Sequence, residues 1–363
     1  MKNTMHDYMK EAPVVARKNI ENRKALTKKF VQLYTSKNYN KIVFVACGSS
    51  YNIACNAKYF VQKYLKLPVY IYWAYTFLNF DIDAVDSNSL VIFLSQSGCS
   101  TNTLDAAHAL KERKIDAISF TNFVDSPMKD EVKSIMNYGN TLGDLFVAKG
   151  FVTSTLFIML CALEAALAKK LLEDKEYEEV LGQIIKAVNK LDEIREVSEK
   201  FYEDNTRFLQ KTYRAMLIGC GPTFATGLEG CQKLEENYGC AATAFEVDEF
   251  SHGPNMEVDK DTTVFLIDAD VSKVHNRILQ CYRAVQGLTD RVVIITSDKS
   301  VSGDYVIRVE NDGIPEEIGV LYLMSPFQYF SHKICEDLRV TAWDRAVSKY
   351  GDEMATKVPG VRY

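Results

Sequence analysis

The sequence lacks the features that mark zinc-binding, membrane-spanning and secreted proteins. Its nine cysteines form no Cys-X-X-Cys pair and no Cys/His spacing that suits zinc, so neither a metal nor another cofactor is expected. The longest uncharged apolar stretch, residues 150–163, is too short and too polar to cross a bilayer, so no membrane partner is expected. No apolar segment of a secretory signal is visible near the N-terminus. An odd number of cysteines is typical of reduced thiols, which predicts a cytoplasmic location.

A strong excess of positive charge is also missing. Lysine and arginine number 43 against 48 aspartates and glutamates, which gives a net charge of −5. This balance argues against a broad nucleic-acid surface, although a local anion pocket remains compatible with it. With 47% apolar and 25% charged residues, the chain has the composition of a folded globular protein rather than a disordered or fibrous one. A length of 363 residues suggests two domains.

Short apolar runs alternate with helical patterns along the first half, which predicts a parallel α/β sheet covered on both faces. The expected strands are residues 41–48, 69–73, 89–94, 115–120 and 132–136, followed by a long apolar helix over 150–172.

The second half repeats the first. The apolar run that ends in Gly221 matches the run that ends in Gly48, and each is followed by a small-residue turn. Strands are expected at 262–267 and 291–296, with helices at 224–238, 273–288 and 316–340. The predicted organisation is an N-terminal helical segment (1–38), a first domain (39–172), a connecting helix (173–205), a second domain (206–340) and a C-terminal tail (341–363).

Two loops rich in serine follow neighbouring strands of the first half. They contain Ser49 and Ser50, and then Ser95, Gln96, Ser97 and Ser100. Ligands of a parallel sheet bind at the carboxyl ends of its strands, and hydroxyl and amide groups at helix N-termini suit a phosphate dianion. Ordinary helix N-caps are the alternative interpretation. Asp268 and Asp270 occupy the matching loop of the second half and would repel phosphate, so the anion site is expected in the first half alone.

An acid and an imidazole stand out in the second half. Glu236 lies near the end of a predicted helix, and His252 follows it in a turn fixed by Gly253 and Pro254. A carboxylate and an imidazole in one pocket are the minimum for moving a proton between neighbouring carbons and opening a sugar ring. The alternative is that Glu236 is a solvated helix charge and that His252 caps a turn.

Four motifs together resemble the double sugar-isomerase (SIS) domain family. They are Ala-Cys-Gly-Ser-Ser-Tyr-Asn (46–52), Ser-Gln-Ser-Gly (95–98), Leu-Glu-Gly (228–230) with Lys-Leu-Glu-Glu (233–236), and Glu-Phe-Ser-His-Gly-Pro (249–254). The resemblance extends from about residue 40 to the tail. It implies two tandem SIS domains, each a mostly parallel five-stranded sheet flanked by helices in three layers, as in flavodoxin.

The resemblance also implies roles for single residues. The hydroxyls of Ser49, Ser50, Ser95, Ser97 and Ser100, with Gln96, fall on the family's phosphate-binding positions. Glu236 falls on the catalytic acid/base, His252 on the histidine of ring opening, and Lys357, with Lys349 as a rival, on an essential lysine near the C-terminus. Gly48, Lys149 and Glu249 fall on further substrate-binding positions. A homodimer is implied, because this histidine commonly comes from the other subunit.

Among family activities, cleavage of a 6-phosphorylated ketosamine such as fructoselysine 6-phosphate is the first choice. The C-terminal residues and the Glu249-Phe250 pair resemble the deglycases, and Cys99-Ser100 departs from the Glu-Thr of glucosamine-6-phosphate synthase. Ser251 departs from both groups, which have a basic residue there. Glucosamine-6-phosphate deamination or aldose–ketose isomerisation is the first alternative. A non-catalytic phosphosugar-binding regulator is the second.

Overall fold

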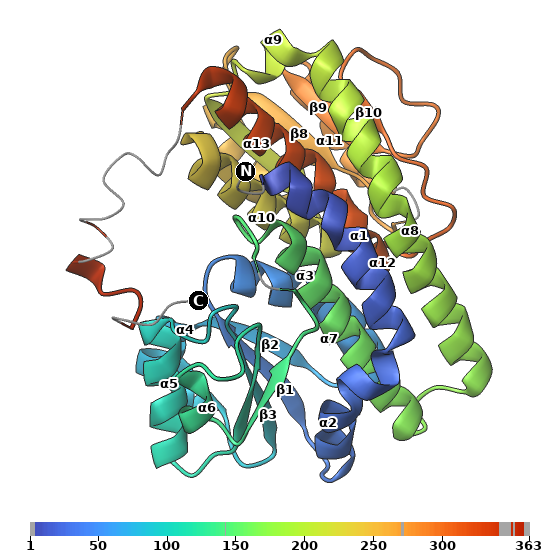
Figure 1. The fold of residues 1–363 in the computed structure, drawn as a ribbon. Helices are drawn as coiled ribbons and strands as arrows, with labels where there is room; N and C mark the ends of the chain where they lie inside the picture. Colours follow the sequence, from blue (N-terminus) through green and yellow to red (C-terminus); the bar gives the residue numbers. More distant parts are fainter. Residues whose placement is uncertain (1–3, 142, 270–271, 341–349, 351–352, 359–363) are drawn as a thin grey trace. The chain divides into compact units, whose positions relative to one another are not determined.

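The computed structural model describes residues 4–141, 143–269, 272–340, 350 and 353–358. These residues divide into two compact units, and Figure 1 labels many of their helices and strands. The first-sheet unit comprises the described residues of 14–181 and 346–363, and the second-sheet unit comprises those of 1–13 and 182–345. The proposed tail residues Lys349 and 359–363, and Asp270, lie outside the described residues.

The first-sheet unit contains five parallel strands in the order β2-β1-β3-β4-β5. Their bounds are β1 Lys41–Ala46, β2 Val69–Trp73, β3 Ser89–Leu94, β4 Ala117–Thr121 and β5 Ser134–Asn137. The three central strands are buried almost throughout, which explains why they read as continuous apolar runs. This arrangement confirms the predicted parallel α/β fold.

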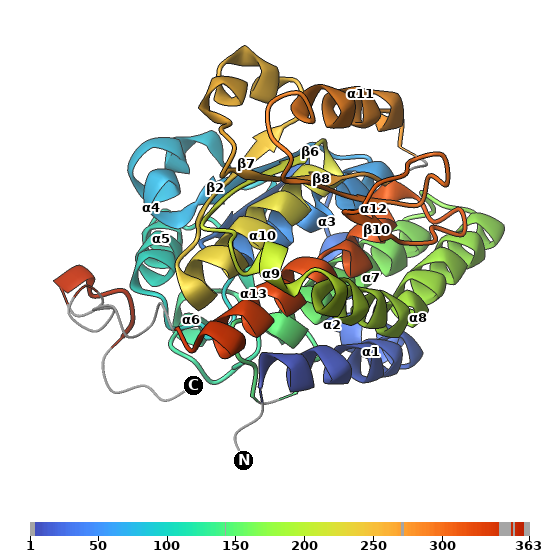
Figure 2. The same ribbon diagram turned by 90° about the horizontal axis from the view of Figure 1, so that it is seen from above.

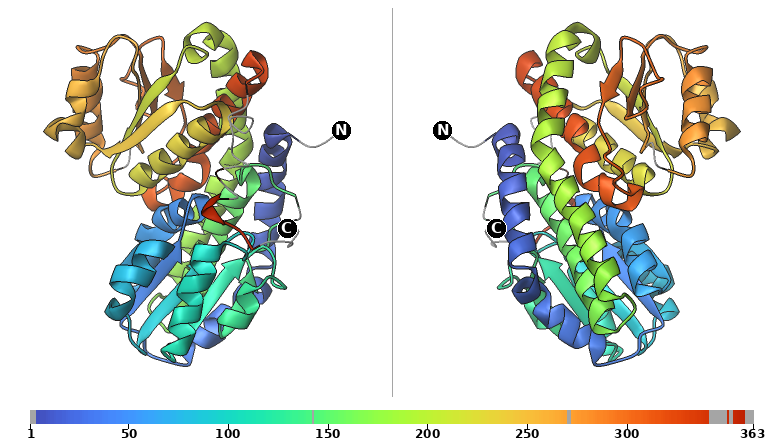
Figure 3. Two further views of the ribbon diagram at one scale, coloured as in Figure 1. Left: turned by 90° about the vertical axis from the view of Figure 1, so that its left-hand side faces the viewer. Right: turned by 90° about the vertical axis from the view of Figure 1, so that its right-hand side faces the viewer.

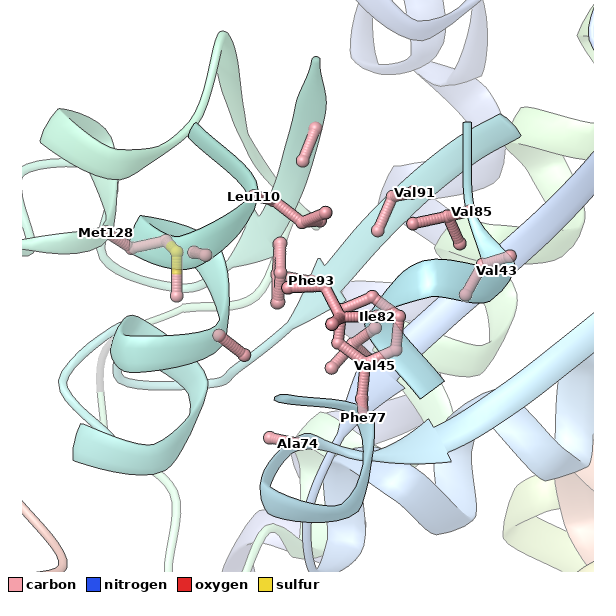
Figure 4. Close-up of a cluster of buried hydrophobic side chains, with 13 residues drawn as sticks. Val43, Val45, Ala74, Phe77, Ile82, Val85, Val91, Phe93, Leu110 and Met128 are labelled. Atoms are coloured by element: carbon pink, nitrogen blue, oxygen red, sulfur yellow. The ribbon is translucent and has the colours of Figure 1, made fainter. Parts of the chain in front are cut away.

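Helices cover both faces of this sheet. One face carries α2 (Arg23–Thr35), α3 (Ser49–Leu65) and α7 (Ala148–Ala168), which pack around side chains such as Ile42 and Phe44. The other face carries α4 (Ala74–Thr76), η1 (Phe77–Asp81), η2 (Ile82–Ala84), α5 (Thr101–Glu112) and α6 (Met128–Glu131). Figure 4 shows Val43, Val45 and Phe93 of the strands meeting Phe77 on that face. Alternate residues of each strand therefore serve the two layers.

Helix α7 is longer than the expected apolar stretch of 150–163. Among the described helices, it alone is long and apolar enough to cross a membrane, but 89% of its most apolar window is buried inside the protein. Burial on all sides accounts for a helix that is apolar all round.

The second-sheet unit contains strands β6 (Arg214–Gly219), β7 (Ala241–Glu246), β8 (Thr263–Ile267), β9 (Val292–Thr296) and β10 (Val306–Arg308). They are parallel, in the order β10-β9-β8-β6-β7. Figure 2 shows α11 (His275–Val285) on the opposite side of this sheet from α10 (Pro222–Tyr238) and α13 (Ser325–Leu338). In both views of Figure 3 each sheet again lies between helices.

The remaining elements complete the units. They are α1 (Met5–Glu21), α8 (Asp174–Asp204), α9 (Thr206–Leu209), η3 (Glu249–His252), η4 (Pro254–Glu257) and α12 (Glu316–Leu323). The single helix expected over 316–340 is instead α12 followed by α13. Pro326 lies in the first turn of α13 and has no backbone N–H for a continuing helix.

The two sheets have the same topology, which confirms the internal repeat. Counted along the chain, each sheet has its strands in the order 2-1-3-4-5. Helices α3 and α10 each have 17 residues and begin directly after Gly48 and Gly221. These two glycines have φ angles of 58° and 56°. Only glycine adopts this conformation readily, so the repeat preserves the turn that starts each helix.

Candidate active site

The serine loops lie at the topological switch point of the first sheet. The chain leaves β1 for the edge strand β2 on one side and leaves β3 for β4 on the other, so the strand order reverses between β1 and β3. In open parallel sheets ligands bind at the carboxyl ends of the strands at such a point. The loop after β1 places Ser49 and Ser50 in the first turn of α3. The loop after β3 runs from Ser95 to Ser100, which caps α5. The predicted phosphate residues thus follow adjacent strands of one sheet.

The Ser95–Ser100 loop is folded tightly by its own hydroxyls. The backbone N–H of Gly98 donates to Ser95 Oγ at 3.2 Å, and the N–H of Cys99 donates to Ser97 Oγ at 3.2 Å. Gly98 has φ 63°, and a Cβ there would lie 2.0 Å from Ser126 Oγ. This close approach of two loops requires glycine at position 98.

The C-terminal segment lies along this loop. Ser100 and Lys357 form an antiparallel β-bridge, and the N–H of Val358 donates to the carbonyl of Cys99 at 3.1 Å. The ammonium of Lys357 donates to Ser97 Oγ at 3.1 Å and to Ser100 Oγ at 3.0 Å. Lys357 is an exposed residue, but the water around its ammonium is partly excluded, which lowers its pKa. The nearby Cys99 acts in the opposite direction on that pKa. The C-terminal segment therefore brings a cation to a loop that has no charged residue of its own.

Gln96 and Lys149 meet a carboxylate that the sequence analysis did not single out. Asp144 accepts hydrogen bonds from the backbone N–H groups of Lys149 (3.0 Å) and Gly150 (2.6 Å), and from Gln96 Nε2 at 3.4 Å. Lys149 is fully buried, and its ammonium donates to Thr141 Oγ1 at 2.6 Å. Asp144 thus fixes the start of α7 and orients Gln96.

Glu236 belongs to a charged cluster on one side of α10. Lys233 is fully buried, lies 3.1 Å from Glu229 Oε1, and also donates a hydrogen bond to Glu236. Glu229 is buried as well, whereas 28% of the Glu236 side chain is exposed. A second carboxylate and an ammonium therefore stand behind the predicted catalytic acid, and the sequence analysis had assigned roles to neither.

This cluster shifts the ionisation of its members. Burial raises the pKa of Glu236 above its ordinary value, an effect that the ammonium of Lys233 opposes and the carboxylate of Glu229 reinforces. Burial acts to lower the pKa of Lys233, but Glu229 and Glu236 outweigh it and raise that pKa. Lys233 therefore stays protonated, and Glu236 is the partly exposed member of the cluster, with a carboxyl whose pKa is raised.

Glu249 and His252 lie on a separate element, η3, after the edge strand β7. Both are exposed, while Phe250 between them is buried in the core. The N–H of Glu249 donates to the carboxylate of Glu246 at 3.0 Å, which holds the start of η3. Among the described residues, no hydrogen bond or ion pair joins His252 to Glu236.

The structure thus groups the predicted site residues in two sets. Ser49, Ser50, Lys149, Lys357 and the Ser95–Ser100 loop belong to the first-sheet unit. Glu236, Glu249 and His252 belong to the second-sheet unit. Whether the two sets act on one substrate stays a prediction. No three His, Cys, Asp or Glu side chains within the described ranges are placed to hold a metal ion.

Comparison with known proteins gives one family. The model of the SIS domain matches residues 35–163 and 208–304. Glutamine–fructose-6-phosphate aminotransferase (isomerizing) of Thermotoga maritima is 30% identical over 65% of this chain and 39% of its own length. The enzyme of the same name from Bartonella henselae is 24% identical over 90% of this chain and 55% of its own length. The chain thus spans about half the length of these relatives.

Solved structures share the whole fold. A candidate phosphosugar isomerase from Clostridium difficile has a TM-score of 0.87 at 22% identity, covering 98% of this chain and 99% of that one. Glucosamine-6-phosphate deaminase from Thermotoga maritima has a TM-score of 0.65 at 23% identity, over 90% and 96% of the two chains. Tagatose-6-phosphate ketose/aldose isomerase from Escherichia coli has a TM-score of 0.70 at 15% identity, over 93% and 95%. At such identities the likeness establishes the double-sheet fold.

Proposed function

Because the chain belongs to the SIS domain family, we propose that it is an enzyme acting on a sugar 6-phosphate, with a 6-phosphorylated ketosamine as its substrate. The observation that carries the proposal is the contact of the Lys357 ammonium with two hydroxyls of the switch-point loop. Hydroxyls, helix N-termini and a cation at one place suit a phosphate dianion. The names of the relatives mention fructose 6-phosphate, which agrees with a sugar 6-phosphate as the substrate class.

Phosphate binding would use the hydroxyls of Ser49, Ser50, Ser95, Ser97 and Ser100. The first turns of α3 and α5 point backbone N–H groups toward the same edge of the sheet, because the first N–H groups of a helix have no intrahelical partner. Lys357 would then exchange its hydroxyl partners for a phosphate oxygen. Gly48 allows the backbone turn that starts α3. Lys149 would support the phosphate site from α7, where its ammonium is held by a hydrogen bond to Thr141.

Proton transfer would use Glu236. In the open-chain ketosamine, this carboxylate would remove a proton from C1, which carries the amine nitrogen, and an enolamine would form with its negative charge on the C2 oxygen. Return of the proton to C2, with transfer of the amine N–H proton to the C2 oxygen, gives a neutral imine at C1 beside a C2 hydroxyl. Water then hydrolyses that imine to release the amine and an aldose 6-phosphate. Glu236 suits this exchange because its pKa is raised toward neutrality by burial.

His252 would assist ring opening from the second copy of a homodimer. It is exposed on η3 and has no hydrogen-bond or ion-pair partner among the described residues, which leaves the imidazole available to another subunit. Glu249, at the start of the same element, would contact the substrate beside it. None of the nine cysteines, all of which lie in the described part of the chain, forms a disulfide, which agrees with a cytoplasmic enzyme.

Turnover on three substrates tests this proposal. Fructoselysine 6-phosphate should release free lysine, whereas glucosamine 6-phosphate should release little ammonia and fructose 6-phosphate should not isomerise at a comparable rate. Deamination or isomerisation is the second candidate, favoured by the deaminase and ketose/aldose isomerase among the fold neighbours. Faster turnover of either of those substrates would replace the first choice.

The variant Glu236→Gln distinguishes an enzyme from a phosphosugar-binding regulator that catalyses no reaction. Glu236→Gln should bind the substrate with unchanged affinity and lose turnover by about 10³-fold or more, as for removal of a general base. Glu235→Gln changes the neighbouring, exposed acid of the same helix and should keep wild-type turnover. A wild-type chain that binds these sugar phosphates without converting any of them would be a phosphosugar-binding regulator.

A further inference from the structure

A pocket of about 220 Å³ lies in the second-sheet unit, between α11 and the two short helices η3 and η4. We call it the α11 pocket. Its apolar lining includes Phe250 and Val285, which are 2% and 1% exposed. Its polar lining includes Ser251, Asn255 and Arg277. An apolar floor with a few polar groups around it is the usual composition of a site for a small molecule.

The internal repeat allows this pocket to be compared with the same place in the first half. When the turns after β1 and β6 are aligned, Asp86 falls on Asp259 and Ser89 falls on Thr262. In both halves the hydroxyl donates to the carboxylate three residues before it, at 3.0 Å and 2.7 Å. The two halves therefore match residue by residue, without a gap, up to the strands β3 and β8.

The first half fills the corresponding space with apolar side chains. In this alignment Leu78 and Ile82 take the places of Ser251 and Asn255. Ile82 is 5% exposed and belongs to the buried cluster that Figure 4 shows, and Leu78 packs against that cluster. The fold can therefore close this space by packing alone. In the second half two polar side chains replace the apolar ones, and the pocket lies where they stand.

The side chain of Asn255 has an unsatisfied oxygen at this pocket. Its Oδ1 is buried and has no hydrogen-bond partner among the described residues. A buried polar atom without a hydrogen bond is unfavourable, whereas the matching Ile82 has no polar side-chain atom to satisfy. An unsatisfied acceptor beside an open pocket indicates a donor that comes from outside the chain.

The charge of Arg277 is balanced within the protein. Its Nε donates to Asp248 Oδ1 at 2.6 Å, and its Nη2 donates to the same oxygen. Its Nη1 donates to Gln280 Oε1 at 2.8 Å. Arg277 is the only charged residue among the described residues that line the pocket. A ligand of the α11 pocket should therefore be uncharged.

We propose that the α11 pocket binds a small, uncharged molecule that carries a carboxamide on an apolar body. The carboxamide N–H would donate to Asn255 Oδ1, and its carbonyl would accept from the amide N–H of the same side chain. The apolar body would lie against Phe250 and Val285. The pocket is smaller than the about 300–1,000 Å³ of sites for drug-sized ligands, so the molecule must be small. The proposal concerns binding and holds whichever reaction the enzyme catalyses.

Such a ligand would also act on the segment that contains His252. Ser251 directly precedes His252 in η3, and Asn255 lies in η4. A molecule that contacts both would hold these two short helices against α11. We therefore expect backbone hydrogen exchange over residues 249–257 to slow when the pocket is occupied.

Two probe molecules test the proposal on the wild-type chain. Benzamide has a carboxamide on an apolar ring, and we expect it to bind with a dissociation constant of about 1 mM or below in a ligand-observed NMR titration. N,N-dimethylbenzamide has the same ring but no N–H, so it should bind at least about tenfold more weakly. Because both probes are applied to the wild type, this comparison does not depend on any variant folding.

A variant that restores the residues of the first half tests the location. Ser251→Leu/Asn255→Ile should weaken benzamide binding by at least about tenfold, because it removes the acceptor and fills the space. It should also keep or raise the melting temperature, since the same residues pack in the first half. Asn276→Leu, at an exposed asparagine of α11 outside the pocket lining, is the matched control and should leave the affinity unchanged.

Cys281 reports on the pocket without a substitution. It lines the pocket and is partly buried. Saturating benzamide should slow its alkylation by N-ethylmaleimide, measured by mass spectrometry, whereas the partly buried Cys335 of the same unit should keep its rate. Absence of benzamide binding would mean that the pocket holds only water and would overturn the proposal. Equal binding of the two probes, or binding that neither protects Cys281 nor responds to the double variant, would overturn it as well.

Discussion

Lys357 and Ser97 are separated by 260 residues in the sequence, yet the Lys357 ammonium lies 3.1 Å from the Ser97 hydroxyl. The same ammonium contacts Ser100, and backbone hydrogen bonds on both sides hold the segment in place. The end of the chain thus provides the positive charge of a loop that otherwise offers only neutral donors.

Replacing Lys357 should weaken phosphate binding selectively. We expect Lys357→Ala to raise the KM for a sugar 6-phosphate by about 10–100-fold, because a charge-assisted hydrogen bond contributes about 1.5–3 kcal/mol. Competition by inorganic phosphate should weaken by a similar factor. Lys299→Ala, at an exposed lysine of the second-sheet unit, is the control and should change neither value. An unchanged KM for Lys357→Ala would remove this lysine from the phosphate site.

A methyl group added at Gly98 should disrupt the serine loop. In Gly98→Ala the new Cβ would lie 2.0 Å from Ser126 Oγ at a φ of 63°, so both sterics and backbone conformation oppose it. We expect the free energy of unfolding to fall by about 2 kcal/mol or more, with loss of phosphate affinity. Urea denaturation measures the free energy of unfolding, and competition by inorganic phosphate measures the phosphate affinity.

Gly182 offers the matched control for that substitution. It lies inside α8, and an added Cβ would meet nothing within 4 Å. Gly182→Ala should therefore raise the free energy of unfolding by about 0.5–1 kcal/mol. If both alanine variants were equally stable, the tight packing of the serine loop against Ser126 would be wrong.

Most of the fold was predictable from the sequence because its determinants are local. The buried strands β1, β3, β8 and β9 are apolar runs followed by turn residues, and positive-φ glycines mark the turns after β1 and β6. Strand β7 was missed because Ala-Ala-Thr-Ala has weak strand propensity, and only its pairing with β6 makes it a strand. β10 has three residues and leaves little pattern to detect.

The site was predictable only where a motif marked it. The serine loops follow directly from strand-turn-helix patterns, whereas the role of Lys233 depends on which side of α10 is buried. Glu229, Lys233 and Glu236, spaced four and three residues apart, look in sequence like a solvated ion-paired face. In the structure this part of α10 is buried rather than solvated. At Gly230 the helix packs against Leu217 and Phe327 too closely for any side chain. Such long-range packing is visible only in three dimensions.

Removing the buried ammonium should destabilise the second-sheet unit. In Lys233→Met, the buried Glu229 loses its cation, and leaving one member of a buried ion pair alone costs about 3–5 kcal/mol. Denaturant unfolding should show this loss. Lys233→Met/Glu229→Gln removes the orphaned charge and should recover most of it. A single variant as stable as the wild type would mean that the pair is not buried in solution.

The pH dependence of turnover should report the environment of Glu236. Its carboxylate must be ionised to accept a proton, and burial raises its pKa, so the acidic limb of kcat/KM should have its midpoint above the ordinary glutamate value of 4.5. The ammonium of Lys233 opposes this rise more strongly than Glu229 reinforces it, so Lys233→Met/Glu229→Gln should move the midpoint to higher pH. Glu235→Gln is the control and should move the midpoint much less, since burial, Lys233 and Glu229 are the main influences on Glu236. A limb that stays at the same pH when Lys233 is removed belongs to another acid, and Glu236 would then not be the base.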